Sequence, residues 1–220
     1  MKDPQNKSLQ HTLQFMEQLR YIAHQGLHYQ TGDRHDQARY EELLALSAQH
    51  YAPVLDLPAP EILKQFQQEL GHMTPKSGVS GALFNATGHI FLVKRKDDYR
   101  WSLPCGWCDV NETPEQALQR EFKEEVNLDV HIDQLVHVFT RLPGEYNALF
   151  TSYHMVYLCE VHSPQTVELE PSELVDSGWF TLSDYADSGH DADFWHREHR
   201  VFALKAQQML LERSLKGSSS

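Results

Sequence analysis

One acidic segment, residues 106–128 with the sequence GWCDVNETPEQALQREFKEEVNL, constrains the fold of this chain more than any other part of it. Thr113 is a residue type that caps helix N-termini, and Pro114 fits the first helical position. Gln116, three residues after the threonine, completes the pattern of a capping box. These signals predict a helix from Pro114 to about Val126.

The two sides of this helix differ in chemistry. At about 100° per residue, an arc of roughly 140° carries one basic and three acidic side chains: Arg120, Glu121, Glu124 and Glu125. Apolar residues recur at every fourth position on the opposite side: Leu118, Phe122 and Val126. One side is therefore predicted to pack into a core, while the other concentrates negative charge.

The acidic side is crowded with carboxylates. Each like-charged pair destabilises a helix by roughly a few tenths of a kcal/mol, and neighbouring carboxylates raise one another's pKa. A cation should offset this cost, and a few carboxylates with open positions suit Mg²⁺ or Mn²⁺ bound together with substrate phosphate. The spacing alone leaves an ordinary acidic surface helix as the alternative.

The same segment resembles the Nudix box, G-x5-E-x7-R-E-U-x-E-E-x-G-U, in which U is a bulky apolar residue. The first glycine and every charged position of the motif are present at the right spacing: Gly106, Glu112, Arg120, Glu121, Glu124 and Glu125. Two positions differ, because Asn127 replaces the second glycine and Phe122 is aromatic where an aliphatic residue is commoner. Asn is the usual substitute for Gly where φ is positive, and neither change touches the charged set.

This resemblance implies a metal-dependent hydrolase of phosphoanhydride bonds. It implies that Mg²⁺ or Mn²⁺ is held by three carboxylates and one backbone carbonyl, those of Glu121, Glu124, Glu125 and Gly106. Because arginine only donates hydrogen bonds, we expect Arg120 and Glu112 to form an ion pair that orients the motif. One of the glutamates or a loop acid would accept the proton of the attacking water.

A second group of acids precedes the last predicted strand and consists of Glu168, Glu170 and Glu173. In Nudix relatives an acid in this region can serve as the catalytic base or as a further metal ligand. We choose Glu173 as the candidate. A solvated acidic turn is the alternative interpretation.

The overall charge disfavours several functions. The 220 residues carry a net charge of −12, which argues against nucleic acid as a partner, because such binding depends on cationic contacts to phosphates. No stretch approaches the length of about 18 apolar residues typical of a membrane span, and the start lacks the apolar region of a signal peptide. We therefore expect a soluble, cytoplasmic protein with no membrane partner.

The cysteines and histidines suggest minor alternatives. Three cysteines give no disulfide framework, but Cys105 and Cys108 have the C-x-x-C spacing of a redox dithiol. Several residues separate Cys108 from the predicted helix, so neither thiol would gain the activation that a helix N-terminus gives. His196 and His199 do not match a zinc-protease signature, and we interpret them as exposed helical residues.

Residues 1–73 are predicted to form a small all-α domain of three helices. Apolar residues recur at helical spacing from Leu9 to Ile22, Gly26 is the expected stop signal, and a second helix is expected over about residues 35–52. The segment resembles the N-terminal helical domain of bacterial hydrolases of X-linked nucleoside diphosphates. Surplus apolar surface on such a module suits dimerisation, so we expect a homodimer.

Residues 74–215 are predicted to form the Nudix domain, an α/β/α sandwich with a mixed sheet. After a linker at 74–76, strands are expected at about residues 79–84, 89–95, 101–104, 129–137, 152–161 and 178–182. The first two should form a hairpin through a turn at 85–88. A helix over 194–215 would close the domain, and residues 216–220 would be a disordered tail.

The function favoured by these features is hydrolysis of ADP-ribose- or CDP-choline-like compounds to a nucleoside monophosphate and phospho-X. The segment 141–147 either contacts the variable part of such a substrate or is a plain surface loop. The alternatives are a nucleoside-triphosphate-cleansing pyrophosphohydrolase, a non-catalytic Nudix-fold metabolite-binding module and a dithiol oxidoreductase. The sequence leaves open the identity of X and of the base, the phosphorus attacked, the general base and the number of metal ions.

Overall fold

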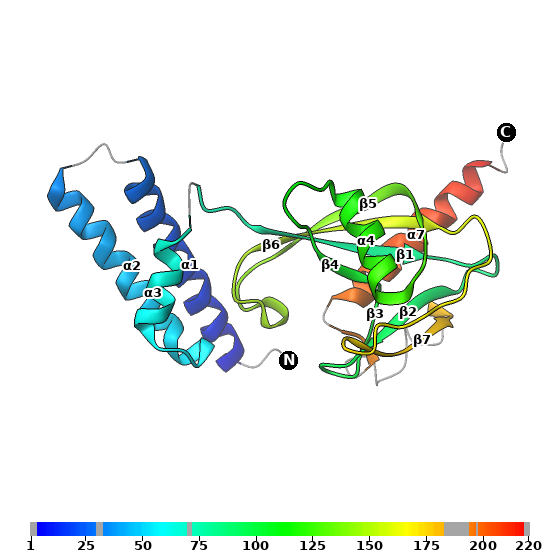
Figure 1. Cartoon of the computed structure of the whole chain (residues 1–220), viewed down its shortest axis with the longest axis horizontal. Coiled ribbons are helices and arrows are strands. Elements are labelled where there is room, and N and C mark those ends of the chain that lie inside the picture. The colour runs from blue at the N-terminus through cyan, green and yellow to red at the C-terminus, as the bar shows by residue number, and fades with distance from the viewer. Residues whose placement is uncertain (1–3, 30–32, 70–71, 183–193, 197, 218–220) are drawn as a thin grey trace. The chain divides into compact units, whose positions relative to one another are not determined.

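The computed structural model divides into two compact units (Figure 1). It describes residues 4–29, 33–69, 72–182, 194–196 and 198–217. The helical unit consists of Met1–Lys76 and Arg141–Ser152, and the sheet unit consists of Ser77–Thr140 and Tyr153–Ser220. The predicted domain boundary at residue 73 did not assign Arg141–Ser152 to the helical unit.

Three helices form the helical unit: α1 (Pro4–Tyr29), α2 (Arg34–Leu55) and α3 (Ala59–Gln67). Asp33 caps α2 by accepting hydrogen bonds from the backbone N–H groups of His35 and Asp36. Contrary to our prediction, Gly26 does not end α1. A Cβ at this position would lie 2.4 Å from the ring of Tyr40, so the glycine allows close packing of two helices.

The segment Arg141–Ser152 is attached to these helices by side-chain contacts. The Tyr51 hydroxyl donates to the Leu149 carbonyl at 3.4 Å, and the ring of Phe150 packs 5.6 Å from that of Tyr51. The carboxylate of Glu17 accepts hydrogen bonds from both the backbone N–H and the hydroxyl of Thr151. The segment therefore shares the core of the helical unit, which consists of Leu13, Met16, Ala23, Leu44, Ala48, Tyr51, Ile62 and Phe66.

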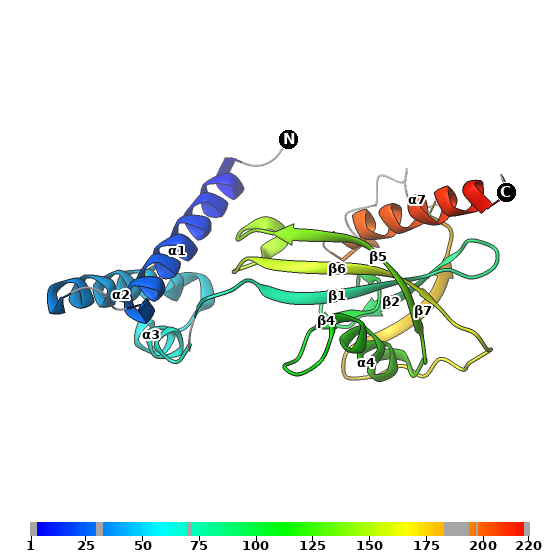
Figure 2. The same cartoon turned by 90° about the horizontal axis from the view of Figure 1, so that it is seen from above.

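Two sheets are described in the remainder of the chain. One has the strand order β4-β1-β6-β5, with β1 (Lys76–Leu83), β4 (Cys105–Trp107), β5 (His131–Arg141) and β6 (Ser152–Glu160). The other has the order β3-β2-β7, with β2 (Ile90–Arg95), β3 (Trp101–Ser102) and β7 (Leu174–Phe180). Helices α4 (Pro114–Val126) and α7 (His199–Gly217) lie on opposite sides of the first sheet, as Figure 2 shows.

The predicted hairpin of β1 and β2 forms at its turn, but the two strands then continue into different sheets. β1 pairs with β4 and β6, whereas β2 pairs with β3 and β7, and a bridge between Phe84 and Ile90 joins the two. The turn itself forms, because the side chain of Asn85 accepts hydrogen bonds from the backbone N–H groups of Thr87 and His89. Turn chemistry is local, but the choice of strand partner is made by distant segments.

Several element boundaries differ from those expected. β5 continues to Arg141, β7 begins already at Leu174, and α7 begins only at His199. α7 extends to Gly217, two residues into the tail that we expected to be disordered, and residues 218–220 lie outside the described part of the chain. Among the helices of the described residues, none combines the length and apolarity that crossing a bilayer requires.

Candidate active site

The acidic helix α4 has the boundaries that its capping signals predicted. The hydroxyl of Thr113 accepts from the backbone N–H of Gln116 at 3.3 Å, and the side-chain oxygen of Gln116 accepts from the backbone N–H of Thr113 at 2.8 Å. Asn127 ends the helix with φ 55° and ψ 31°, the left-handed conformation that its place in the motif suggested. Both ends of the helix are therefore fixed by local chemistry.

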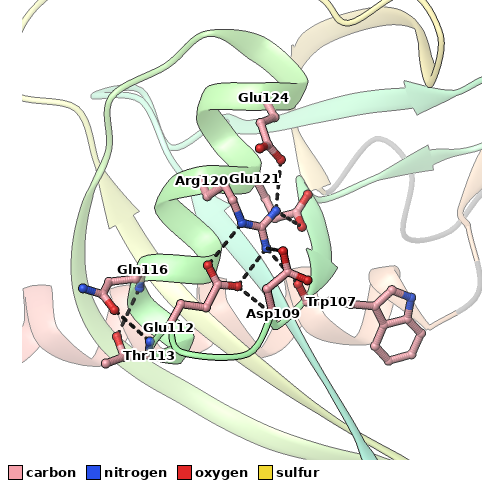
Figure 3. A network of polar contacts seen from close by, with 8 residues as sticks. All are labelled: Trp107, Asp109, Glu112, Thr113, Gln116, Arg120, Glu121 and Glu124. Carbon is pink, nitrogen blue, oxygen red and sulfur yellow. Dashed lines mark hydrogen bonds and ion pairs between the residues drawn. The ribbon is translucent and has the colours of Figure 1, made fainter.

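Arg120 is the centre of a polar network on the acidic side of α4 (Figure 3). Its Nε and Nη2 donate to the two carboxylate oxygens of Glu112, at 3.1 and 2.8 Å. Its Nη1 donates to Glu121 at 2.8 Å and to Glu124 at 3.0 Å, and Nη2 also reaches the Trp107 carbonyl at 3.0 Å. The hydrogen bonds between Arg120 and Glu112 are the main reason why the pKa of the guanidinium is raised. The same bonds lower the pKa of Glu112.

Gly106 lies against the carboxylate of Glu121. Gly106 is the central residue of β4, where it pairs with Val79 of β1. A Cβ on this glycine would lie 1.9 Å from Glu121 Oε1, so any other residue would displace the carboxylate. The side chain of Glu121 is only 13% exposed, and its burial raises its pKa, an effect that Arg120 partly opposes.

Glu125 is the most deeply buried acid of the motif, with 3% of the residue exposed. Its carboxylate accepts a hydrogen bond from the backbone N–H of Cys105 at 3.2 Å. Burial raises the pKa of Glu125 well above the usual value, and the charge of Glu121 adds to this effect. The buried Glu125 and the half-buried Glu121 beside it thus repel one another when both are ionised.

Glu173 lies close enough to these two carboxylates to act on them electrostatically, because its charge contributes to raising the pKa values of both Glu121 and Glu125. Its carbonyl accepts from the backbone N–H of Lys96 at 2.8 Å. The preceding segment is attached to the end of α4, since the N–H of Glu170 donates to the Glu125 carbonyl at 2.9 Å. Glu173, the loop acid chosen from the sequence, thus lies near the acids of α4.

In the ranges that the structure describes, no three His, Cys, Asp or Glu side chains are arranged as a ready metal site. The reason lies in the hydrogen bonds: Glu121 and Glu124 are drawn to Arg120, while Glu125 is drawn to the Cys105 N–H. The acids predicted from the sequence therefore either bind Arg120 or lie close to the acids that do. Their carboxylate oxygens do not converge on a single point.

The cysteine pair and the two C-terminal histidines singled out in the sequence have structural rather than redox or metal-binding surroundings. Cys105 and Cys108 form no disulfide, and burial raises the pKa of the Cys108 thiol, which disfavours the thiolate that dithiol chemistry needs. His196 and His199 are buried, not exposed as we expected. His196 Nδ1 lies 2.6 Å from Asp98 Oδ2, and His199 Nδ1 accepts from the Leu103 N–H at 3.2 Å, so both rings bind loops beside α7.

The segment 141–147, which the sequence left as either a substrate contact or a plain surface loop, lies in the helical unit. Leu142 and Pro143 line a cleft of about 500 Å³ together with residues of α1 and the segment after α3. The walls contributed by α1 include Gln14 and Tyr21. The structure thus places this segment beside α1, a contact that no local sequence signal could have predicted.

A family model described as the NUDIX domain matches residues 74–203, which is more than half of the chain. The chain belongs to the Nudix family. A second model, described as the UDP-X-like, N-terminal oligomerisation domain, matches residues 10–66. These matches confirm the family predicted from the acidic segment and the fold predicted for the whole chain, three N-terminal helices followed by a Nudix α/β domain with a mixed sheet.

Individual relatives are consistent with this membership. A provisionally named ADP-ribose pyrophosphatase, YjhB of Bacillus subtilis (strain 168), is 37% identical over 126 residues, which are 57% of this chain and 60% of YjhB. The aligned part thus spans less than two thirds of that relative. A MutT/nudix family protein from Enterococcus faecalis superposes with a TM-score of 0.52 at 20% identity, covering 83% of this chain and 76% of that one.

A third relative is the Nudix domain of Shewanella oneidensis NrtR, solved in complex with ADP ribose. It superposes with a TM-score of 0.51 at 17% identity, covering 67% of this chain and 97% of that one. At such identities the two solved structures show that the fold is shared.

Proposed function

We propose that this Nudix protein hydrolyses the phosphoanhydride bond of nucleoside diphosphates linked to another group, such as ADP-ribose or CDP-choline, to a nucleoside monophosphate and phospho-X. The observation that carries the proposal is the placement of Glu121 directly against Gly106, beside the buried Glu125. The name of the Bacillus subtilis relative and the UDP-X-like N-terminal match favour X-linked diphosphates over nucleoside triphosphates.

The donor set fits Mg²⁺ or Mn²⁺. All candidate ligands are oxygens, contributed by the carboxylates of Glu121, Glu124 and Glu125 and the carbonyl of Gly106, and hard divalent cations prefer such ligands. The raised pKa values of Glu121 and Glu125 mark a place where a cation would stabilise the ionised forms. When bound, the metal would neutralise phosphate oxygens and lower the pKa of the attacking water.

The other charged residues of the motif would position the metal-binding carboxylates. Arg120 donates to Glu121 and Glu124 and would orient these two carboxylates. The two-point hydrogen bond between Arg120 and Glu112 would in turn hold the guanidinium in place. We propose Glu173 as the acceptor of the proton from water, because its charge acts on both Glu121 and Glu125.

We further propose that the protein is a homodimer that associates through its helical unit. The support is the match of residues 10–66 to a domain described as an oligomerisation domain. The surface of α1 suits this role, since large apolar side chains at Phe15, Ile22 and Tyr29 are 60%, 46% and 60% exposed at intervals of seven residues. Such an exposed stripe is unfavourable in an isolated monomer.

The hydrolysis is tested with a panel of nucleotides in the presence of Mg²⁺ or Mn²⁺, with phosphate detected after phosphatase treatment. We expect ADP-ribose- or CDP-choline-like compounds to be cleaved fastest, with a pH optimum above 7, because the glutamates must be ionised and water must lose a proton. Excess EDTA should abolish turnover. Faster cleavage of triphosphates would favour the cleansing alternative, and binding without turnover would favour a metabolite-binding module.

Hydrolysis in ¹⁸O-labelled water identifies the phosphorus that is attacked. We expect the label on one phosphate-bearing product only, either the nucleoside monophosphate or phospho-X, as mass spectrometry would show. Label on neither product, or full activity in excess EDTA, would contradict water attack assisted by a metal.

A further inference from the structure

The edge strand β4 presents consecutive residues to opposite faces of its sheet. Gly106 pairs with Val79 and Trp107 pairs with Gly78. Gly106 faces Glu121 of α4, and side chains alternate along a strand, so Trp107 points to the other face. Because β4 is an edge strand of its sheet, the indole projects from the rim of the sheet, one residue from the Gly106 that faces Glu121.

The indole of Trp107 has a rigid support on one side and solvent on another. Its ring centroid lies 5.5 Å from that of His154, with the planes at 53°. His154 is buried and stacks on Phe202 of α7 at 6.3 Å. Gly78 leaves room for this contact, since a Cβ there would lie 2.9 Å from the His154 ring. Trp107 nevertheless remains 48% exposed.

The backbone of Trp107 is connected to the acidic network. Arg120 Nη2 donates to the Trp107 carbonyl at 3.0 Å, and the indole points away from the carboxylates, as Figure 3 shows. The same guanidinium therefore holds Glu112 and fixes the backbone from which the indole projects. An exposed aromatic ring in a fixed position beside a phosphate site is suited to stack on a flat aromatic group.

We propose that Trp107 is a stacking platform for the nucleobase of the substrate, an assignment that rests on the proposed hydrolysis of nucleoside diphosphates. In such a substrate one ribose separates the diphosphate from the base, so a base can lie one side chain away from the phosphate site. Stacking on an aromatic ring accepts any base because every base has a π-face. The platform thus gives affinity for the nucleotide part and leaves the choice of X to other residues.

The test compares two variants of Trp107. Trp107→Leu keeps an apolar side chain but has no aromatic ring, and Trp107→Phe keeps an aromatic ring that is smaller than the indole. Trp179→Leu is the matched control, because Trp179 is 44% exposed on β7 of the other sheet. With ADP-ribose and CDP-choline as substrates, we expect Trp107→Leu to raise KM about tenfold or more, the effect of losing one base–aromatic stack. We expect kcat within about threefold of wild type, most of the affinity restored by Phe, and no change for Trp179→Leu.

A second readout does not depend on turnover. Titration of the Mn²⁺-loaded protein with AMP should quench tryptophan fluorescence, and Trp107→Leu should abolish that quenching, whereas Trp179→Leu should retain it. Quenching that survives in Trp107→Leu, or a KM unchanged by this variant, overturns the platform while leaving the hydrolysis intact. With substrates that share a base and differ only in X, a KM increase confined to one X would show that the indole contacts X and would also overturn the platform. Wild-type protein that cleaves no diphosphate would instead refute the proposed function, and the AMP titration would still decide on the platform.

Discussion

Glu124 is the most accessible carboxylate of the acidic side, with 59% of its side chain exposed. We predict that Glu124→Gln lowers kcat by about 10²-fold or more, because it removes a charged ligand that acts on the transition state. The fold should remain intact, since an exposed ion pair contributes only about 0–1 kcal/mol to stability. Steady-state kinetics with Mn²⁺ and circular dichroism measure the two effects.

Asp129→Asn is the matched control for that prediction. Asp129 is an exposed acid just past α4, and it pairs with Lys123 instead of Arg120. Its neutralisation should leave kcat unchanged. Turnover of Glu124→Gln within about threefold of wild type would remove Glu124 from the proposed ligand set.

Glu125 makes the stability of the metal-free protein depend on pH. Its pKa in the folded protein lies well above its unfolded value near 4.5, so the folded state binds more protons than the unfolded state between these two values. Stability should therefore fall as pH rises from about 4.5 through the raised pKa. We predict that wild type without metal loses thermal stability relative to Glu125→Gln over this window.

Thermal melts at a series of pH values, each with and without Mn²⁺, measure that difference. Added Mn²⁺ should stabilise wild type increasingly as pH rises and should affect Glu125→Gln much less, because a ligand must be ionised to bind metal. Identical pH dependences of the two metal-free proteins would show that the burial of Glu125 has no thermodynamic consequence.

At the scale of elements, the C-terminal cap of α4 has a left-handed backbone conformation that few residue types adopt without strain. Asn127 has φ 55° at the C-cap, where a residue with a Cβ is strained by roughly 1–2 kcal/mol unless it is Asn or Asp. We predict that Asn127→Ala lowers the free energy of unfolding by about 1 kcal/mol in urea denaturation.

Asn127→Gly serves as the comparison, because glycine adopts positive φ without a steric cost. This variant should be as stable as wild type or more stable. Equal destabilisation by Ala and Gly would mean that the Asn side chain, and not its tolerance of positive φ, stabilises the end of the helix.

At the scale of the whole molecule, the prediction concerns association. Among the 26 residues of α1 only Lys7, Glu17 and Arg20 carry a full charge, and Glu17 and Arg20 bond within the helical unit to Thr151 and Glu69. An uncharged apolar stripe can meet its own copy without like-charge repulsion. We predict that Phe15→Glu and Ile22→Glu each convert a dimer into a monomer by light scattering.

Leu46→Glu is the control, because this residue of α2 is 39% exposed but lies on another helix. Dissociation by Leu46→Glu alone would move the interface to α2, and a wild type that is monomeric at micromolar concentration would refute the homodimer. Point variants are preferable to deleting the helices, since deletion would also remove the contacts of Tyr51 with Leu149 and Phe150.

The sequence alone determined the features that depend on neighbouring residues. Both caps of α4 follow from residues within one helical turn of its ends. The contact of Arg120 with Glu124 follows from a spacing of four on a helix. The family resemblance rested on these same short spacings, so the family and the overall fold could be predicted and are confirmed.

Only the tertiary structure decided the features that join distant segments. Three interactions of the site depend on which segments lie beside α4. They are the contact of Glu121 with Gly106, the hydrogen bond from the Cys105 N–H to Glu125, and the effect of the Glu173 charge on the pKa of Glu125. Burial, which sets the pKa of Glu125, results from packing of the whole unit. Local spacing carries no information about strand partners, because a strand has hydrogen-bonding groups on both edges and can pair with any strand that the chain brings near.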